Sequence, residues 1–116
     1  MTVARQTLGK SGEDLAVAEL GRRGYAILAR RYRTRYGEID IIARDGDTTV
    51  FVEVKARATG ECGTAAEAVT PRKQRRLATM ALDYLARHTS TDIPCRFDVV
   101  AIDGEDLTVY RDAFSL

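Results

Sequence analysis

The sequence predicts an α/β protein with a mixed central sheet of about five strands flanked by helices. Two segments carry apolar residues at helical spacing, an Asp-Gly turn joins two alternating runs, and further strand-like runs follow the second helix. The resulting order, a helix, three strands, a helix and two strands, is typical of a layered core. Because 116 residues is the usual size of one domain, we expect a single domain over residues 1–116.

The first helix is expected from about Thr7 or Ser11 to Arg23, because Gly24 follows as a stop signal. Its apolar stripe consists of Ala16, Val17 and Leu20. Glu13 lies three, four and seven residues before these positions and therefore shares the inward stripe. An inward carboxylate is costly unless a charged group meets it, so the simpler interpretation is a boundary residue that reaches solvent or caps the helix.

Three strands are expected next, over Tyr25–Leu28, Gly37–Arg44 and Thr48–Arg57. Asp45-Gly46 predicts a two-residue hairpin turn, in which paired positions sum to 91. This register gives one apolar face, made of Ile39, Ile41, Ala43, Val50, Val52 and Val54. The other face carries Glu38, Asp40, Ile42, Phe51, Glu53 and Lys55. A slip of one residue would mix apolar and charged side chains on each face, so the pattern supports the predicted register.

The second helix follows Thr70-Pro71, a favourable N-cap with proline at the first helical position. Its predicted apolar stripe is Leu77, Met80, Ala81, Tyr84 and Leu85. A short helical turn is expected near Glu67. Strands over Arg96–Asp103 and Leu107–Arg111 complete the sheet, and Asp98 is expected to pair with Arg96 or another arginine.

The composition excludes several classes of protein. No apolar run is long enough to span a bilayer, and the first ten residues lack the apolar stretch of a signal peptide, so we expect a cytoplasmic protein without a membrane partner. Two cysteines and one histidine are too few for a disulfide framework, a zinc centre or a serine–histidine–aspartate triad. Any metal would bind oxygen ligands, which favours Mg²⁺ or Mn²⁺.

The charged face of the predicted hairpin is the strongest functional signal. Asp40 and Glu53 lie on one side of adjacent strands, within reach of one cation, and Lys55 points to the same side. Two carboxylates and an ammonium group suit metal-assisted phosphodiester hydrolysis. The plainer interpretation is solvated charge on an exposed sheet. However, Phe51 and Ile42 lie on the same face, which indicates that this face is not fully exposed to solvent.

These residues resemble the PD-(D/E)XK nuclease signature, with Asp40 as the aspartate and Glu53-Val54-Lys55 as the E-x-K. The wider series comprises Gly12-Glu13, Gly24-Tyr25, Gly37-Glu38-Ile39-Asp40, Phe51 to Lys55, Ala68-Val69 with Lys73, and Arg96-Phe97-Asp98-Val99. It is similar to the bacterial YraN-like family of uncharacterised, proposed endonucleases. The resemblance implies a restriction-endonuclease-like fold, related to archaeal Holliday junction resolvases, and assigns Glu13, Asp40, Glu53 and Lys55 to the site. Related resolvases work as dimers, which leaves a homodimer open.

Two basic clusters indicate a polyanionic partner despite the net charge of +1. The predicted nucleic-acid-binding residues are Arg33, Arg35, Tyr36, Lys73 and Arg76. Lys73 is chosen because it matches the family pattern. An equally weighted alternative for the first cluster is a solvated loop with its tyrosines packed on the sheet. Glu38 is assigned a supporting role, because the predicted register pairs it directly with Glu53.

The leading hypothesis is a Mg²⁺- or Mn²⁺-dependent nuclease acting on DNA, with RNA still open. Asp40 and Glu53 would bind the cation, joined by Glu13 and the backbone carbonyl of Val54, and Lys55 would act on the water or the phosphate. Two alternatives have the same sequence features. One is a non-catalytic module that binds nucleic acid, and the other is a protein whose charged sheet edge binds another protein.

Overall fold

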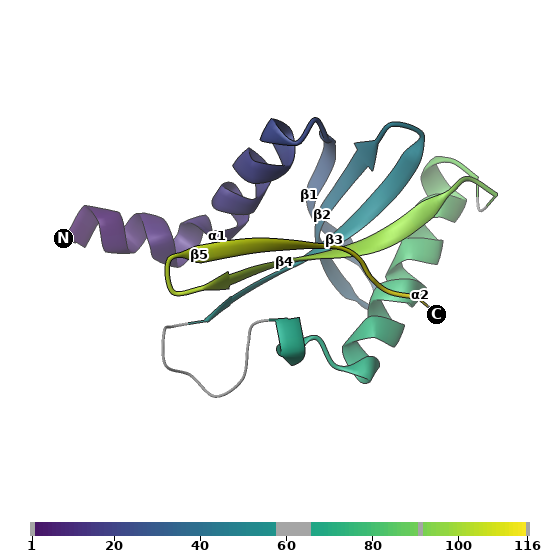
Figure 1. Ribbon diagram of the computed structural model, residues 1–116. Helices are drawn as coiled ribbons and strands as arrows, with labels where there is room; N and C mark the ends of the chain where they lie inside the picture. Colours follow the sequence, from purple (N-terminus) through teal and green to yellow (C-terminus); the bar gives the residue numbers. More distant parts are fainter. Residues whose placement is uncertain (1, 58–65, 91, 116) are drawn as a thin grey trace.

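A mixed five-stranded sheet with two helices forms the protein in the computed structural model (Figure 1), which confirms the predicted α/β class. The structure describes residues 2–57, 66–90 and 92–115, and only the backbone over residues 2–11 and at residue 66. The elements are α1 (Thr2–Arg22), β1 (Ala26–Thr34), β2 (Gly37–Asp45), β3 (Thr48–Arg57), the 3₁₀ turn η1 (Ala66–Ala68), α2 (Pro71–His88), β4 (Cys95–Asp103) and β5 (Asp106–Phe114).

The strands lie in sequence order, β1-β2-β3-β4-β5. All neighbouring strands are antiparallel except β3 and β4, which are parallel. Parallel neighbours need a long crossover, and α2 lies within the connection that supplies it. This arrangement is consistent with a restriction-endonuclease-like fold. No described helix is both long enough and apolar enough to cross a membrane.

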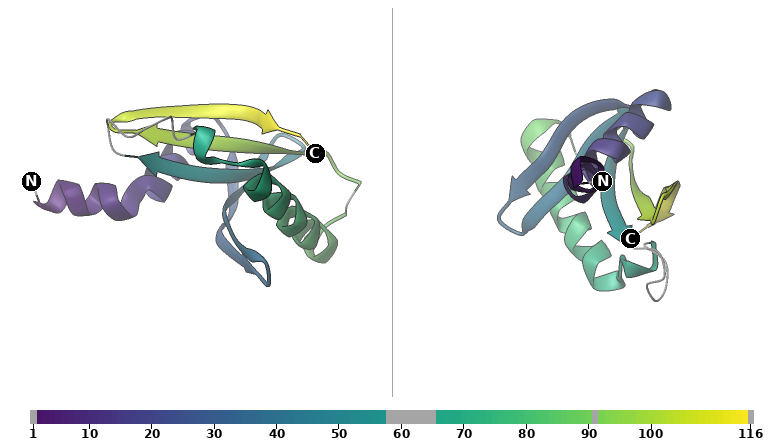
Figure 2. Two further views of the ribbon diagram at one scale, coloured as in Figure 1. Left: turned by 90° about the horizontal axis from the view of Figure 1, so that it is seen from below. Right: turned by 90° about the vertical axis from the view of Figure 1, so that its left-hand side faces the viewer.

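The two helices cover opposite faces of the sheet (Figure 2), because alternate strand residues point to opposite sides. On the α1 face the buried residues are Ala16, Leu20, Tyr25, Ile41, Ala43, Val50, Val52, Val100 and Ile102. On the α2 face they are Ile39, Ile42, Phe51, Val69, Leu77, Met80, Ala81, Leu85, Phe97 and Val99. The predicted stripe of α2 is therefore confirmed, with Tyr84 packed at its margin.

The helix signals predict the start of α2 and the end of α1 correctly, but not the start of α1. Thr70 caps α2 by accepting a hydrogen bond from the backbone N–H of Lys73, and Pro71 occupies the first position. Gly24, with a φ of 91°, ends α1 as predicted. The helix α1 starts at Thr2, earlier than the predicted Thr7 or Ser11.

The hairpin register differs from the predicted one. Asp45 pairs with Thr48 and Ile41 with Val52, so paired positions sum to 93 and the turn is Gly46-Asp47. Gly46 has a φ of 61°, which suits glycine at the first position of a two-residue loop. Asp45 stays in the strand, where its carboxylate accepts a hydrogen bond from Arg96 at 3.0 Å. The consequence is functional: continuing this register places Asp40, instead of Glu38, beside Glu53.

Two further differences concern β1 and β2. The strand β1 reaches Thr34 instead of ending at Leu28, so the basic stretch that was expected as a loop is mostly an edge strand, a position where charge is common. Ile39 packs on the α2 face, although Ile41 lies on the α1 face two residues later. The strict alternation of side chains between the two faces of the sheet therefore fails around Asp40. Arg31, which lies opposite Asp40 in β1, has a backbone φ of 51°.

Candidate functional site

Asp40 lies where β2 separates from β3. The pairing between these strands ends at Ile41 and Val52, so the next backbone groups of β3 need other partners. The Oδ2 atom of Asp40 accepts a hydrogen bond from the backbone N–H of Val54 at 2.8 Å. The side chain thereby replaces the missing strand-to-strand bond, and this fixes a carboxylate against β3.

Glu53 lies beside Asp40, and its residue is only 7% exposed. The two carboxyl groups share a hydrogen bond. Burial first, and then the negative charge of Glu53, raise the pKa of Asp40 to about 7, while the Val54 N–H opposes this rise. Two buried acids in contact hold one proton between them unless a cation arrives.

Lys73 supplies a positive charge to this pair. Its Nζ atom lies 3.0 Å from Oε2 of Glu53, and the lysine side chain is 32% exposed. The residue occupies the first turn of α2, which Thr70 caps. Sequence reasoning placed Lys73 among the nucleic-acid contacts but missed this ion pair, because no sequence pattern links the start of α2 to β3.

A pocket of about 210 Å³ opens beside the carboxylate pair. It is lined by Glu38, Asp40, Glu53, Lys73, Arg76, Leu77 and Met80. Gly37 begins β2 beside this pocket, and its φ of 134° is a backbone conformation that favours glycine. A larger hollow of about 690 Å³, beside His88, contains neither carboxylate of the pair.

Glu38 contributes to the rim of this pocket. Its carboxylate pairs with Arg33 at 2.8 Å, and both side chains are exposed. The predicted direct pairing of Glu38 with Glu53 is wrong, because the register is shifted as described above.

Glu13 points inward, and its charge contributes to the raised pKa of Asp40. The preceding residue, Gly12, faces β3, where a Cβ added to it would lie 3.8 Å from the Cβ of Ala56. The Glu13 carboxylate, 13% exposed, pairs with Arg30 at 2.8 Å and with Arg31 at 3.2 Å. These arginines are the charged groups that an inward carboxylate requires. A role for Glu13 as a metal ligand stays a prediction.

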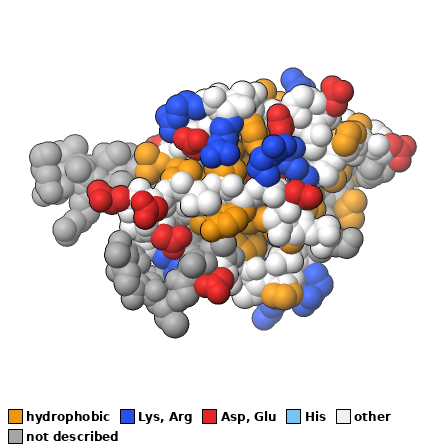
Figure 3. Space-filling view, in the orientation of Figure 1, with side chains coloured by type: hydrophobic (Ala, Val, Ile, Leu, Met, Phe, Trp, Pro, Cys, Tyr) orange, Lys and Arg blue, Asp and Glu red, His pale blue; other side chains and the backbone are white. Residues whose placement is uncertain are grey.

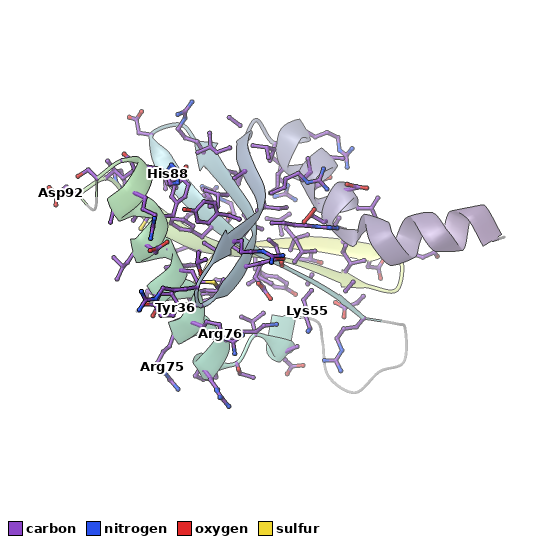
Figure 4. All side chains as sticks on the ribbon, turned by 180° about the vertical axis from the view of Figure 1, so that it is seen from behind. Tyr36, Lys55, Arg75, Arg76, His88 and Asp92 are labelled. Atoms are coloured by element: carbon purple, nitrogen blue, oxygen red, sulfur yellow. The ribbon has the colours of Figure 1, made fainter. Side chains whose placement is uncertain are left out.

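Lys55 lies near the end of β3, to the right of Arg76 and Tyr36 in Figure 4, and it is not among the residues that line the pocket. It is half-buried and has no ion-pair partner among the residues that the structure describes. A merely structural role for Lys55, as the partner of a cross-strand ion pair, therefore finds no support in the described contacts. Its predicted catalytic role stays a prediction.

The predicted binding residues lie on two elements around the pocket. Arg33 belongs to β1, whereas Arg35 and Tyr36 form the turn before β2, where the guanidinium of Arg35 lies 5.3 Å from the Tyr36 ring centre. Arg76 lines the pocket from α2 (Figure 4). On the face seen in Figure 3, by contrast, basic side chains are interspersed with acidic ones.

The donor set suits a hard divalent cation, because two carboxylates lie side by side in a pocket whose described lining includes neither histidine nor cysteine. No cluster of three or more histidine, cysteine, aspartate or glutamate side chains is close enough to hold a metal within the described ranges. The protein would therefore offer two carboxylates, Asp40 and Glu53. Mg²⁺ is commonly held in this way, with water and substrate phosphate completing its shell.

The amino-acid sequence matches a family of known proteins. A family model described as "Uncharacterised protein family UPF0102" matches residues 12–102. A UPF0102 protein of Geotalea uraniireducens is 49% identical over 96% of this chain and 91% of its own length. One from Ralstonia pickettii is 50% identical over 93% and 90%, and one from Symbiobacterium thermophilum is 54% identical over 83% and 81%. None of these descriptions states an activity.

Proposed function

The chain belongs to the uncharacterised protein family UPF0102, which the YraN-like resemblance anticipated, and from its site we propose that it is a divalent-metal-dependent nuclease acting on DNA. The observation that carries this proposal is the contact between Asp40 and Glu53 in a pocket rimmed by Lys73 and Arg76. Burying two acids together costs free energy of folding. Buried acids with a raised pKa in a pocket are typical of functional sites.

Asp40 and Glu53 would hold Mg²⁺ or Mn²⁺, with the carbonyl of Val54 as a further ligand and Glu13 nearby. A cation bound there would polarise a phosphate and lower the pKa of a bound water. The chain's own residues supply the rest. Arg76 and the turn carrying Arg35 would orient the phosphate backbone, and Lys55 would stabilise the negative charge that develops on the scissile phosphate. Tyr36, at the exposed turn, would stack on a base.

The test is a cleavage screen with Mn²⁺ over duplex, nicked, branched and single-stranded DNA and over RNA. We expect cleavage of at least one DNA substrate, its loss with a chelator, and its loss in Asp40→Asn. The variant keeps a hydrogen-bond acceptor for Val54 but loses the charge, so a loss of cleavage is attributable to the charge. Cleavage by Asp40→Asn equal to that of the wild type would overturn the proposal.

A second candidate is a module that binds nucleic acid without cleaving it. The observation that favours it is the ion pair between Lys73 and Glu53, which already neutralises the site within the described structure. This candidate predicts salt-dependent binding of nucleic acid with no cleavage of any substrate in the screen.

A further inference from the structure

Lys73 occupies the position of a counter-ion at the carboxylate pair. Its Nζ atom contacts the Oε2 atom of Glu53 at 3.0 Å, and the glutamate side chain is only 9% exposed. No other Lys or Arg in the described part of the chain is within ion-pair distance of Glu53. The positive charge therefore comes from an element, α2, that is separate from both strands of the carboxylate pair.

A metal ion and Lys73 would bind the same carboxylate. A divalent cation between Asp40 and Glu53 would lie close to the ammonium that now contacts Glu53, and the two positive charges would repel each other at this distance. A lysine can yield its place, because its ammonium is a compact charge on a flexible stem and about one third of this side chain is exposed.

We propose that Lys73 is an exchangeable counter-ion, which holds Glu53 in the free protein and transfers to a phosphate when nucleic acid binds, thereby freeing Glu53 for the metal. This inference rests on the proposed function. Arg76 lines the same pocket, so a phosphate there would meet two cations. By linkage, nucleic acid strengthens metal binding and metal strengthens nucleic-acid binding, so the site is completed only when its substrate is present.

The experiment measures Mn²⁺ binding to the free protein by calorimetry at about pH 8, which is above the pKa of about 7 of Asp40. The variants are Lys73→Gln and the matched control Arg72→Gln, which removes the same charge from the same turn of α2. We expect Lys73→Gln to bind Mn²⁺ about tenfold more tightly than the wild type, which corresponds to about 1.4 kcal/mol. Arg72→Gln should stay within about twofold, because charges on the helix surface are screened.

A second readout follows the folded state. Without metal, Lys73→Gln leaves Glu53 without its partner, so the melting temperature should fall, and Mn²⁺ should restore it more than it raises that of the wild type.

Unchanged or weaker Mn²⁺ binding by Lys73→Gln would overturn the counter-ion role while leaving the nuclease proposal intact. An equal gain in Arg72→Gln would also overturn it, since the effect would then come from net charge. Absence of Mn²⁺ binding in every variant would overturn this inference and the metal-dependent function together.

Discussion

Asp40 holds a proton up to about neutral pH because it is buried against a second acid. Its pKa rises from an ordinary value of 3.8 to about 7 in the folded protein. The folded chain therefore binds a proton that the unfolded chain releases, and stability falls as pH rises from about 4 to about 7. Each unit of difference in pKa is worth about 1.4 kcal/mol.

Asp40→Asn should remove most of this pH dependence. Without metal, we expect the free energy of unfolding of the wild type to drop between about pH 5 and about pH 8, and that of the variant to change less. Urea unfolding at both pH values, in the presence of a chelator, measures the difference. Equal pH dependence in the two proteins would show that Asp40 ionises normally.

Lys55→Ala should separate catalysis from folding. Because Lys55 has no ion-pair partner among the described residues, its loss should change the melting temperature little. Cleavage should fall by about 10²–10³, the usual cost of removing one group that stabilises a transition state. Mn²⁺ and nucleic acid should still bind. A variant that is destabilised but fully active would contradict the assigned role.

At the residue scale, the carboxylate pair could be predicted from the sequence because strand alternation places Asp40 and Glu53 on one face whichever of the two registers forms. The contacts that surround them could not. Lys73 reaches Glu53 from a helix about twenty residues later in the chain, and Arg30 meets Glu13 across two elements. Such pairs depend on how helices sit on the sheet, which local patterns do not encode.

At the scale of elements, the predicted nucleic-acid contacts come from the hairpin β1–β2, which carries Arg35, and from α2, which contributes Arg76 to the pocket. Replacing Arg35 on the first or Arg76 on the second by alanine should each reduce the salt dependence of nucleic-acid binding. The expected loss of slope is about 0.9 per phosphate contact for duplex DNA and about 0.7 for a single strand.

Arg22→Ala is the matched control for this measurement. Arg22 is exposed near the end of α1, where it pairs with Glu19, away from the pocket residues. Binding isotherms over a range of salt concentrations should give it the wild-type slope. If the salt dependence of binding does not change in Arg35→Ala and Arg76→Ala, these two side chains do not contact phosphate.

The elements themselves were predicted best where a signal is local. The Thr70-Pro71 start of α2 and the Gly24 stop of α1 are examples. The turn between β2 and β3 was displaced by one residue, because Arg96 holds Asp45 in the strand from β4. β1 was predicted too short, because Tyr32 packs against Tyr84 of α2 and thereby extends a strand whose arginines suggested a loop.

At the scale of the whole molecule, a buried polar network joins Tyr25, just after α1, to strands β2, β4 and β5. Asp98 is fully buried and accepts hydrogen bonds from Arg96 at 3.0 Å, Tyr25 at 2.9 Å and the backbone N–H of Asp112 at 2.9 Å. Arg96 continues the network to Asp45. The predicted pairing of Asp98 with Arg96 is confirmed, and it connects the end of α1, the hairpin and β5.

Asp98→Ala should therefore lower the free energy of unfolding by about 3–5 kcal/mol, because it leaves Arg96 without its buried partner. Tyr25→Phe, which removes the hydrogen bond donated to Asp98 and the one accepted from Arg96, should cost about 1–3 kcal/mol. Urea denaturation gives both values. Because this network is separate from the pocket, Tyr25→Phe should bind Mn²⁺ as the wild type does, and weakened binding would refute that separation.

The central claim is that Asp40 and Glu53 form a site for a divalent cation, and calorimetric titration with Mn²⁺ tests it most directly. The comparison is between the wild type, Asp40→Asn and Glu38→Gln, the last of which alters a rim carboxylate of the same pocket. We predict heat of binding in the wild type and in Glu38→Gln, and its loss in Asp40→Asn. Indistinguishable titrations of wild type and Asp40→Asn would contradict the claim.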